Sequence, residues 1–260
     1  MLTALLYGVL ASSGLLIGAV IGLVTAPPRR LVAAVVAFGS GVLVSALTFE
    51  LMEEAFTEGS PAFTIGGFLL GAVIYVVADV LLERMAARSP RREGRDPQDV
   101  VAGAQQIPQT PEQATVSGVA LLVGAALNGI PENAAISIGL VADGQRLALV
   151  LLGAVFLGNV PGSMSSAVGM AKEGRSPAYI LAAWSIVAVA STLATVVGYS
   201  LLSGLSPNLT AALLALAAGA ILAMLADTMM PEAFQNGGPL VALATAVGFA
   251  CAFLLSHLTG

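Results

Sequence analysis

Runs of apolar residues long enough to cross a lipid bilayer constrain the fold of this sequence more than any other feature. The 260 residues are 57% hydrophobic and 10% charged, whereas about a quarter of the residues in an average soluble domain are charged. A bilayer core about 30 Å thick needs roughly 20 apolar residues per helix. We therefore expect an all-α polytopic membrane protein with eight transmembrane helices. Pro, Gly or charged residues bound the eight spans, at about 3–25, 31–53, 63–83, 115–141, 146–171, 177–203, 208–230 and 238–258.

The basic residues indicate how these spans are oriented. With eight spans, nine of the ten Lys and Arg residues fall in loops on one side, and only Arg146 falls on the other. Because loops rich in Lys and Arg stay in the cytoplasm, both termini are predicted to lie outside. Residues 88–114, polar and rich in Pro and Gln, form the predicted cytoplasmic loop. The nine residues are Arg29, Arg30, Arg84, Arg88, Arg91, Arg92, Arg95, Lys172 and Arg175.

The amino-acid composition also indicates the kind of organism that the chain comes from and excludes some kinds of activity. Nine arginines against one lysine, with abundant Ala and Val, indicate a bacterial source, so we expect the bacterial cytoplasmic (inner) membrane. The single cysteine, Cys251, allows no disulfide framework and no thiolate metal cluster. Ser163 and Ser165 have no nearby base in the sequence, and the only histidine is His257. We therefore expect neither an enzyme nor a bound cofactor, and no nucleic-acid partner.

Two segments near the ends of the chain resemble each other. "GVLVSALTFELMEEAFTEGSP" (41–61) and "GAILAMLADTMMPEAFQNGGP" (219–239) align without gaps and are identical at 8 of 21 positions. Five spans separate them, and this odd number makes the copies run in opposite directions through the membrane. An inverted repeat of this kind is typical of transporters. Accidental similarity between two apolar segments is the alternative.

A shorter pair lies between the two copies. "LNGIPENAAISIG" (127–139) aligns with "LGNVPGSMSSAVG" (157–169) in two adjacent, antiparallel spans. The predicted layout is three helices, a central pair and three inverted helices, so that helices 1–3 repeat as helices 6–8. The corresponding segments are 1–87 for the first repeat, 88–114 for the loop, 115–171 for the central pair and 172–260 for the inverted repeat.

The central pair carries the chemistry that packing alone does not explain. Pro131 and Pro161 fall inside their helices, and each removes an N–H and clashes with a carbonyl group one turn earlier. Irregular backbone at membrane depth is tolerated where it lines a polar cavity. Glu132 follows the first proline, and a carboxylate near the bilayer centre costs about 2.5–3.5 kcal/mol on insertion scales. We therefore predict a cation site around Glu132.

Other polar side chains could complete such a site. Oxygen ligands suit hard or borderline divalent cations. Alternatively, Glu132 is protonated and bonded to a carbonyl group, and the Asn and Ser residues connect helices. The candidate metal ligands are Glu132, Asn128, Asn159, Asp227, Glu50, Ser163 and Met164.

At these residues the sequence resembles the ZIP (Zrt-, Irt-like) metal transporter family. "NGIPEN" and "GNVPGS" are similar to the central motifs of that family, and "FELMEEAF" and "ADTMMPEAF" to the ends of its second and seventh spans. The resemblance covers essentially the whole chain and implies eight spans, external termini, a three-plus-two-plus-three repeat and a sliding transport unit. Several family ligands differ here, since Asn128 takes a histidine position and Gly162 a glutamate position.

Three functions follow as hypotheses. The first is a ZIP-like transporter that moves a divalent metal (Zn, Fe or Mn) by alternating access, with an oxygen-rich site on kinked helices 4 and 5. The second is a carrier with the same fold for another small solute. The third is a membrane scaffold or sensor that transports nothing. The expected partners are the divalent metal ion, the lipid bilayer and a second copy of the chain in a homodimer.

Overall fold

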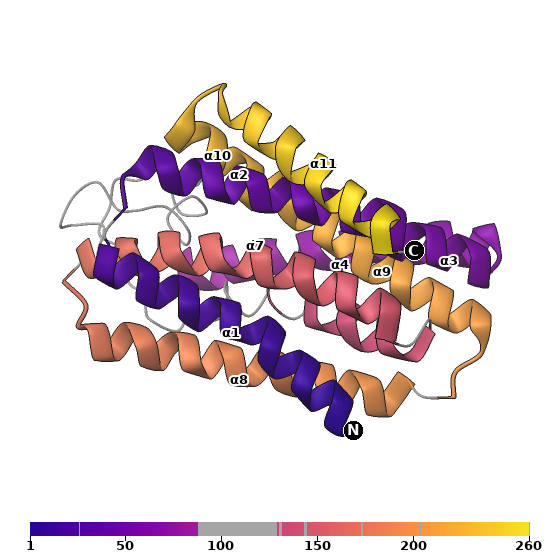
Figure 1. Cartoon of the computed structure of the whole chain (residues 1–260). Helices are drawn as coiled ribbons and strands as arrows, with labels where there is room; N and C mark the ends of the chain where they lie inside the picture. The colour runs from indigo at the N-terminus through magenta and orange to yellow at the C-terminus, as the bar shows by residue number, and fades with distance from the viewer. Residues whose placement is uncertain are drawn as a thin grey trace.

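A computed structural model describes residues 1–25, 27–87, 129, 132–142, 145–172, 174–202 and 204–259. Every regular element within these ranges is a helix (Figure 1). This confirms the all-α class predicted from the sequence. The predicted loop 88–114 and most of the fourth predicted span lie outside the described residues, as do Asn128 and Pro131.

Most of the predicted spans correspond to long apolar helices. Two shorter apolar helices, Glu132–Ala142 and Val241–Leu254, fall in the fourth and eighth predicted spans. These lengths fit a multi-pass membrane protein. Six helices are long and apolar enough to cross a membrane: Leu2–Thr25, Arg29–Glu58, Pro61–Leu81, Leu147–Lys172, Pro177–Leu202 and Pro207–Gly237.

Proline and glycine set many of the helix ends. Pro61, Pro177 and Pro207 are the first residues of three helices, where the missing N–H would have no helical partner. Gly174 and Gly204 follow two helices with φ angles of 83° and 90°, a conformation that glycine adopts without steric cost. In chain order the labelled elements are α1 (Leu2–Thr25), α2 (Arg29–Ala46), η1 (Leu47–Met52), α3 (Glu53–Glu58), α4 (Pro61–Ala87), α7 (Gln145–Lys172), α8 (Pro177–Leu202), α9 (Pro207–Met224), η3 (Leu225–Met229), α10 (Met230–Gly237) and α11 (Val241–Thr259).

The helices pack as two groups. The first bundle comprises α1, the helix 132–142, α7 and α8, with α1 lying against both α7 and α8. The second bundle comprises α2, η1, α3, α4, α9, η3, α10 and α11, in which α4 packs along α9 and α2 along α11. Figure 1 shows α1, α7 and α8 together below α2, α10 and α11. The two bundles meet where α2 lies against α7.

Glycine allows the close helix pairs of the second bundle. A Cβ atom on Gly219 of α9 would overlap the carbonyl oxygen of Phe68 in α4. A Cβ atom on Gly41 of α2 would overlap the carbonyl oxygen of Thr245 in α11. Small residues of this kind let membrane helices approach through their backbones. Gly41 and Gly219 are also an identical pair in the alignment of 41–61 with 219–239.

Two π-helical segments occupy corresponding places in the chain. η1 starts at Leu47 and η3 at Leu225, which are an identical pair in the same gapless alignment. Each continues a long helix, α2 or α9, and these two helices run in opposite directions (Figure 1). A π-helical turn inserts an extra residue and turns the following side chains around the helix axis. Both segments carry an acidic residue, Glu50 and Asp227.

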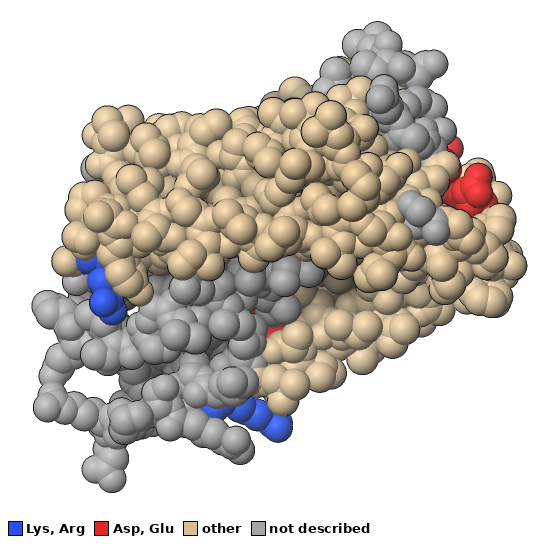
Figure 2. Space-filling model, turned by 90° about the horizontal axis from the view of Figure 1, so that it is seen from below, with Lys and Arg blue, Asp and Glu red and all other residues tan. Residues whose placement is uncertain are grey.

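Exposed apolar side chains lie along the sides of the helices, and charged residues lie at their ends. Large apolar side chains of α8, such as Ile186, Val189 and Leu193, are exposed, which lipid tolerates and water does not. Figure 2 shows a broad side without charge, with basic residues toward one end and acidic residues toward the other. At one end of the bundles Arg29, the first residue of α2, lines a recess with Val168 of α7, and Arg175 lies between α7 and α8; this end is called the basic end.

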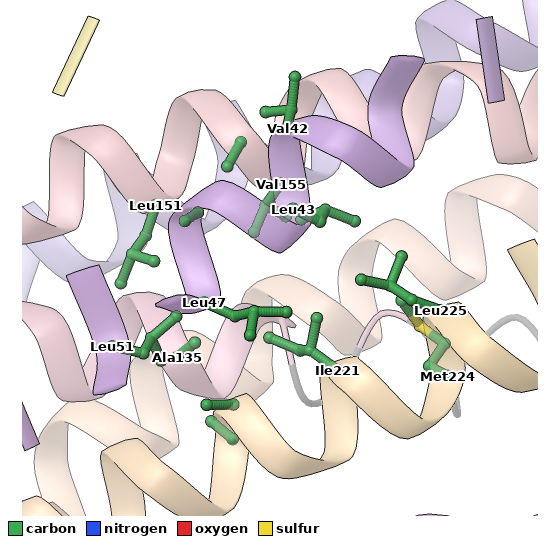
Figure 3. Packing of buried hydrophobic residues seen from close by; sticks show 14 of the residues in the cluster. Val42, Leu43, Leu47, Leu51, Ala135, Leu151, Val155, Ile221, Met224 and Leu225 are labelled. Carbon is green, nitrogen blue, oxygen red and sulfur yellow. The ribbon is translucent and has the colours of Figure 1, made fainter. Parts of the chain in front are cut away.

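A core of buried aliphatic side chains connects the two bundles. Leu47 and Leu51 of η1 lie close to Ala135 of the helix 132–142 (Figure 3). Leu151 and Val155 of α7 belong to the same cluster. The contact between the bundles is therefore largely apolar here, and dispersion and shape rather than charge pairing hold it together.

Candidate functional site

Glu132 is buried at the start of the helix 132–142. Its side chain is 3% exposed, and its Oε2 atom has no hydrogen-bond partner among the described residues. Ala135 and Ile136, three and four residues later, lie on the same helical face and are fully buried. Glu132 therefore faces the protein interior and not the lipid.

The helix 132–142 packs against the first turns of α7 through Gly139. A Cβ atom on Gly139 would lie 3.0 Å from Cδ1 of Leu151 and 3.5 Å from the backbone nitrogen of Ala148. Glu132, seven residues and about two turns before Gly139, lies on the same face of its helix as Gly139. This is the face that packs against α7, and burial of a charge there is costly.

Asn133 fixes the rotation of this helix against α8. Its Nδ2 atom donates to the carbonyl oxygen of Gly129 over 2.9 Å, and Thr195 Oγ1 donates to its Oδ1 atom over 3.0 Å. Gly129 also lies against Ser191 of α8. Successive residues of a helix differ by about 100°, so a helix that turns Asn133 toward α8 turns Glu132 toward another side. The sequence analysis did not predict the contact between Asn133 and Thr195. The spacing of four residues between Gly129 and Asn133 is compatible with the bond from Asn133 to the Gly129 carbonyl oxygen.

Asn159 and Ser163 connect α7 to α1. Asn159 Nδ2 donates to the carbonyl oxygen of Ala11 over 3.4 Å. Ser163 Oγ approaches the carbonyl oxygen of Gly14 at 3.5 Å and donates to the carbonyl oxygen of Asn159 over 2.8 Å. These contacts agree with the alternative of hydrogen bonds between helices. Neither residue is joined to Glu132 by a hydrogen bond within the described part of the chain.

Pro161 lies where α7 touches the second bundle. α7 remains helical through this residue. A Cβ atom on Gly39 of α2 would lie 3.4 Å from Pro161 Cγ and 3.4 Å from the carbonyl oxygen of Leu157. That carbonyl group has no N–H partner at Pro161, because proline lacks one. Because Gly39 has no side chain, α2 approaches α7 closely at Pro161.

Glu50 lines a cavity beside α7 and α11. Its side chain is 9% exposed, and Ser256 Oγ of α11 donates a short hydrogen bond to its Oε1 atom. The cavity has a volume of about 130 Å³. Residues of α2, η1, α7 and α11 line it: Phe38, Val42, Ser45, Ala46, Glu50, Leu149, Val150, Gly153, Ala154, Leu157, Cys251, Ala252 and Ser256.

Asp227 lies in η3 and is exposed. It lies near the buried Tyr75 of α4, whose hydroxyl group is also close to Asp79 and Thr228. That hydroxyl group has no hydrogen bond of normal geometry among the described residues. Met164 is buried in the apolar core, which agrees with the packing role usual for methionine.

Ser165 and Glu232 form a contact that the sequence did not indicate. Ser165 Oγ of α7 donates a hydrogen bond of 2.6 Å to Oε1 of Glu232 in α10. The two residues line a small recess together with Arg29 and Asn236. The contact therefore joins the first bundle to the second at the end where Arg29 lies. Only the position of Glu232 in the repeated segment drew attention to it in the sequence.

The predicted ligands are thus distributed over several places. The described residues contain no group of three or more His, Cys, Asp and Glu side chains close enough to hold a metal ion. Glu132 faces the central core, Glu50 a cavity beside α11, and Asp227 the neighbourhood of α4. Asn128 lies outside the described residues. Among the described residues, the arrangement offers one buried carboxylate with an unpartnered oxygen, that of Glu132.

A scan against models of known protein families finds no match, and a search of curated proteins finds none either.

Proposed function

We propose that this chain is a membrane transporter of divalent metal cations and that Glu132 is the carboxylate that holds the cation. The observation that carries the proposal is the burial of Glu132 with an unpartnered oxygen inside a bundle of membrane-length helices. An ionisable residue at such depth most often marks an ion pathway. A single carboxylate binds a cation loosely, which suits a carrier that must release its cargo.

The proposed movement is a displacement of the first bundle along the second. Hydrogen bonds such as Thr195 to Asn133 and Asn159 to Ala11 hold the first bundle together. Around Gly39 and Pro161 the described residues of the two bundles touch through backbone and proline atoms, and the hydrogen bond between Ser165 and Glu232 is the inter-bundle bond that sliding would have to break. Such a movement would expose Glu132 first to one side of the membrane and then to the other.

The proposed family is ZIP, on the strength of the motifs and the repeat. The alignment of 41–61 with 219–239 relates not only similar sequences but also the starts of two π-helical segments and two close-packed glycines. Inverted repeats are frequent in secondary transporters. We propose three helices, a central pair and three inverted helices, eight spans in all, as the complete arrangement.

The proposed location is the bacterial inner membrane, with both termini outside. Arg29 lies in one recess with Val168 near the end of α7, Arg30 follows Arg29, and Arg175 comes just after α7. Positively charged ends remain in the cytoplasm. Transport from the acidic end to the basic end would then be inward.

Uptake into reconstituted vesicles tests the proposal. Purified protein is placed in vesicles that contain a fluorescent chelator, and Zn²⁺, Fe²⁺ and Mn²⁺ are added outside. We expect saturable uptake by the wild type and the signal of protein-free vesicles for Glu132→Gln. Glu58→Gln is the matched control, because Glu58 is exposed at the end of α3. Unchanged uptake by Glu132→Gln would remove Glu132 from the mechanism, and no uptake by folded wild-type protein would favour a scaffold or sensor.

A second candidate function is the transport of a small organic solute. The cavity beside Glu50 favours it, because about 130 Å³ is more than a bare metal ion requires. Saturable uptake of an organic solute without any response to metals would support this candidate over the first.

A further inference from the structure

The cavity beside Glu50 is distinct from the surroundings of Glu132. It contacts α7 through Leu149, Gly153 and Leu157, whereas the helix 132–142 contacts α7 through Leu147 and Leu151. Among the described residues, none of 132–142 lines the cavity. A ligand in the cavity would therefore not occupy the position of Glu132.

The size of the cavity limits its occupant. An engineered apolar cavity of about 150 Å³ in another protein accepts benzene. The volume of about 130 Å³ beside Glu50 therefore suits an organic molecule of about five or six heavy atoms.

The chemistry of the walls selects a cation. Most of the lining is apolar, and its polar groups are the side chains of Ser45, Glu50 and Ser256. Among the described residues that line the cavity there is neither Lys nor Arg. A serine hydroxyl group stabilises a buried carboxylate but does not neutralise it, whereas an ammonium group does both.

We propose that this cavity binds a small organic ammonium ion. Its ammonium group lies at Glu50 and the two serine hydroxyl groups, and its hydrocarbon part lies against Val150, Ala154 and Ala252. The inference goes beyond metal transport and does not depend on it.

The chain provides its own reporter for the test. Cys251 is its single cysteine, lines the cavity and is exposed. A ligand in the cavity would cover this thiol and slow its reaction with a maleimide. The full-length protein in nanodiscs is labelled with and without n-butylammonium chloride. The same concentration of 1-butanol serves as a neutral probe of equal length, and potassium chloride serves as the ionic control.

We expect n-butylammonium to slow labelling saturably by about fivefold or more at concentrations several times its dissociation constant, as one-site occupancy requires. Butanol and potassium chloride should leave the rate almost unchanged. Glu50→Gln should abolish the protection, and Ser256→Ala should weaken it. Glu53→Gln is the matched control, since Glu53 is exposed three residues later.

Three results would overturn the proposal: equal protection by butanol and butylammonium, no protection by either, or full protection that persists in Glu50→Gln. If Glu50→Gln does not fold, the labelling rates of the wild type with n-butylammonium and with 1-butanol still test the proposal. Loss of metal uptake in the vesicle assay would leave this labelling result unaffected, so the two proposals fail independently.

Discussion

Ser165 of α7 donates a 2.6 Å hydrogen bond to the Glu232 carboxylate of α10 and so ties the two bundles together beside Arg29. The rest of the α2–α7 contact around Gly39 is apolar. The hydrogen bond between Ser165 and Glu232 therefore restrains separation of the two bundles more at the basic end than along the rest of the α2–α7 contact. In the proposed transport cycle this bond must break before the basic end can open.

Removal of the Ser165 hydroxyl group should loosen this end. A hydrogen bond contributes about 1 kcal/mol net, so the open population should rise about fivefold in Ser165→Ala. The measurement is maleimide labelling of Val168→Cys in a Cys251→Ala background, because Val168 lines the recess beside Ser165 and Glu232. Labelling should accelerate by a similar factor.

Ser185→Ala is the control for this variant. Its hydroxyl group donates only within its own helix, to the carbonyl oxygen of Leu181, so the labelling rate of Val168→Cys should not change. Equal rates in the Ser165→Ala and parent proteins would show that the bond does not hold the end closed.

Gly71 should tolerate no side chain. A Cβ atom there would overlap the carbonyl oxygen of Leu216 in α9, and a backbone carbonyl group cannot move aside cheaply. Gly71→Ala should therefore destabilise the protein by about 1–3 kcal/mol, the usual cost of overpacking. Gly66→Ala in the same helix has open space around it and should be nearly neutral. Thermal unfolding in detergent compares the two, and equal melting temperatures would contradict the α4–α9 contact.

Asn133 and Thr195 should be energetically coupled, because their side chains share a 3.0 Å hydrogen bond in the first bundle. Hydrogen bonds between membrane helices average about 0.6 kcal/mol in double-mutant cycles. Asn133→Ala, Thr195→Val and the double variant should give a coupling free energy of about that size. The measurement is unfolding by titration with a denaturing detergent. Strict additivity would mean that the pair does not anchor the helix 132–142.

Glu132 should reduce stability in the absence of a cation. Burial of an ionised carboxylate costs more free energy than burial of a neutral amide of the same shape, and Glu132 Oε2 has no hydrogen-bond partner among the described residues. Glu132→Gln should therefore raise the melting temperature measured without metal. Glu50→Gln should not, because the Glu50 carboxylate accepts a hydrogen bond from Ser256. A lower melting temperature for Glu132→Gln would show that the carboxylate is well satisfied.

Helix positions were largely predictable from the sequence. The first predicted span, 3–25, corresponds to α1 at Leu2–Thr25, and the sixth, 177–203, to α8 at Pro177–Leu202. These boundaries depend on the bilayer thickness and on proline and glycine at the ends, both of which act locally. The buried position of Glu132 was also predictable, because a lipid-facing carboxylate would be costly.

The partners of the polar side chains were not predictable. Asn159 and Ser163 were predicted as ligands beside Glu132, which stays a prediction, and the sequence did not indicate their contacts with carbonyl oxygens of α1. Every side of these helices is apolar enough to face either lipid or protein, so periodicity does not reveal which face meets which neighbour. The contact between Ser165 and Glu232 depends in addition on how α7 and α10, far apart in the chain, lie relative to each other.

The sequence by itself thus determined the helical class, the span lengths, the charged ends and the similarity of 41–61 to 219–239, since each follows from short-range chemistry or direct comparison. The tertiary structure alone decided that Glu132 faces α7, that Glu50 lines a cavity with Ser256, and that Ser165 meets Glu232. The physical reason is that a helix satisfies its backbone internally, whereas its side-chain partners come from whichever helices pack against it.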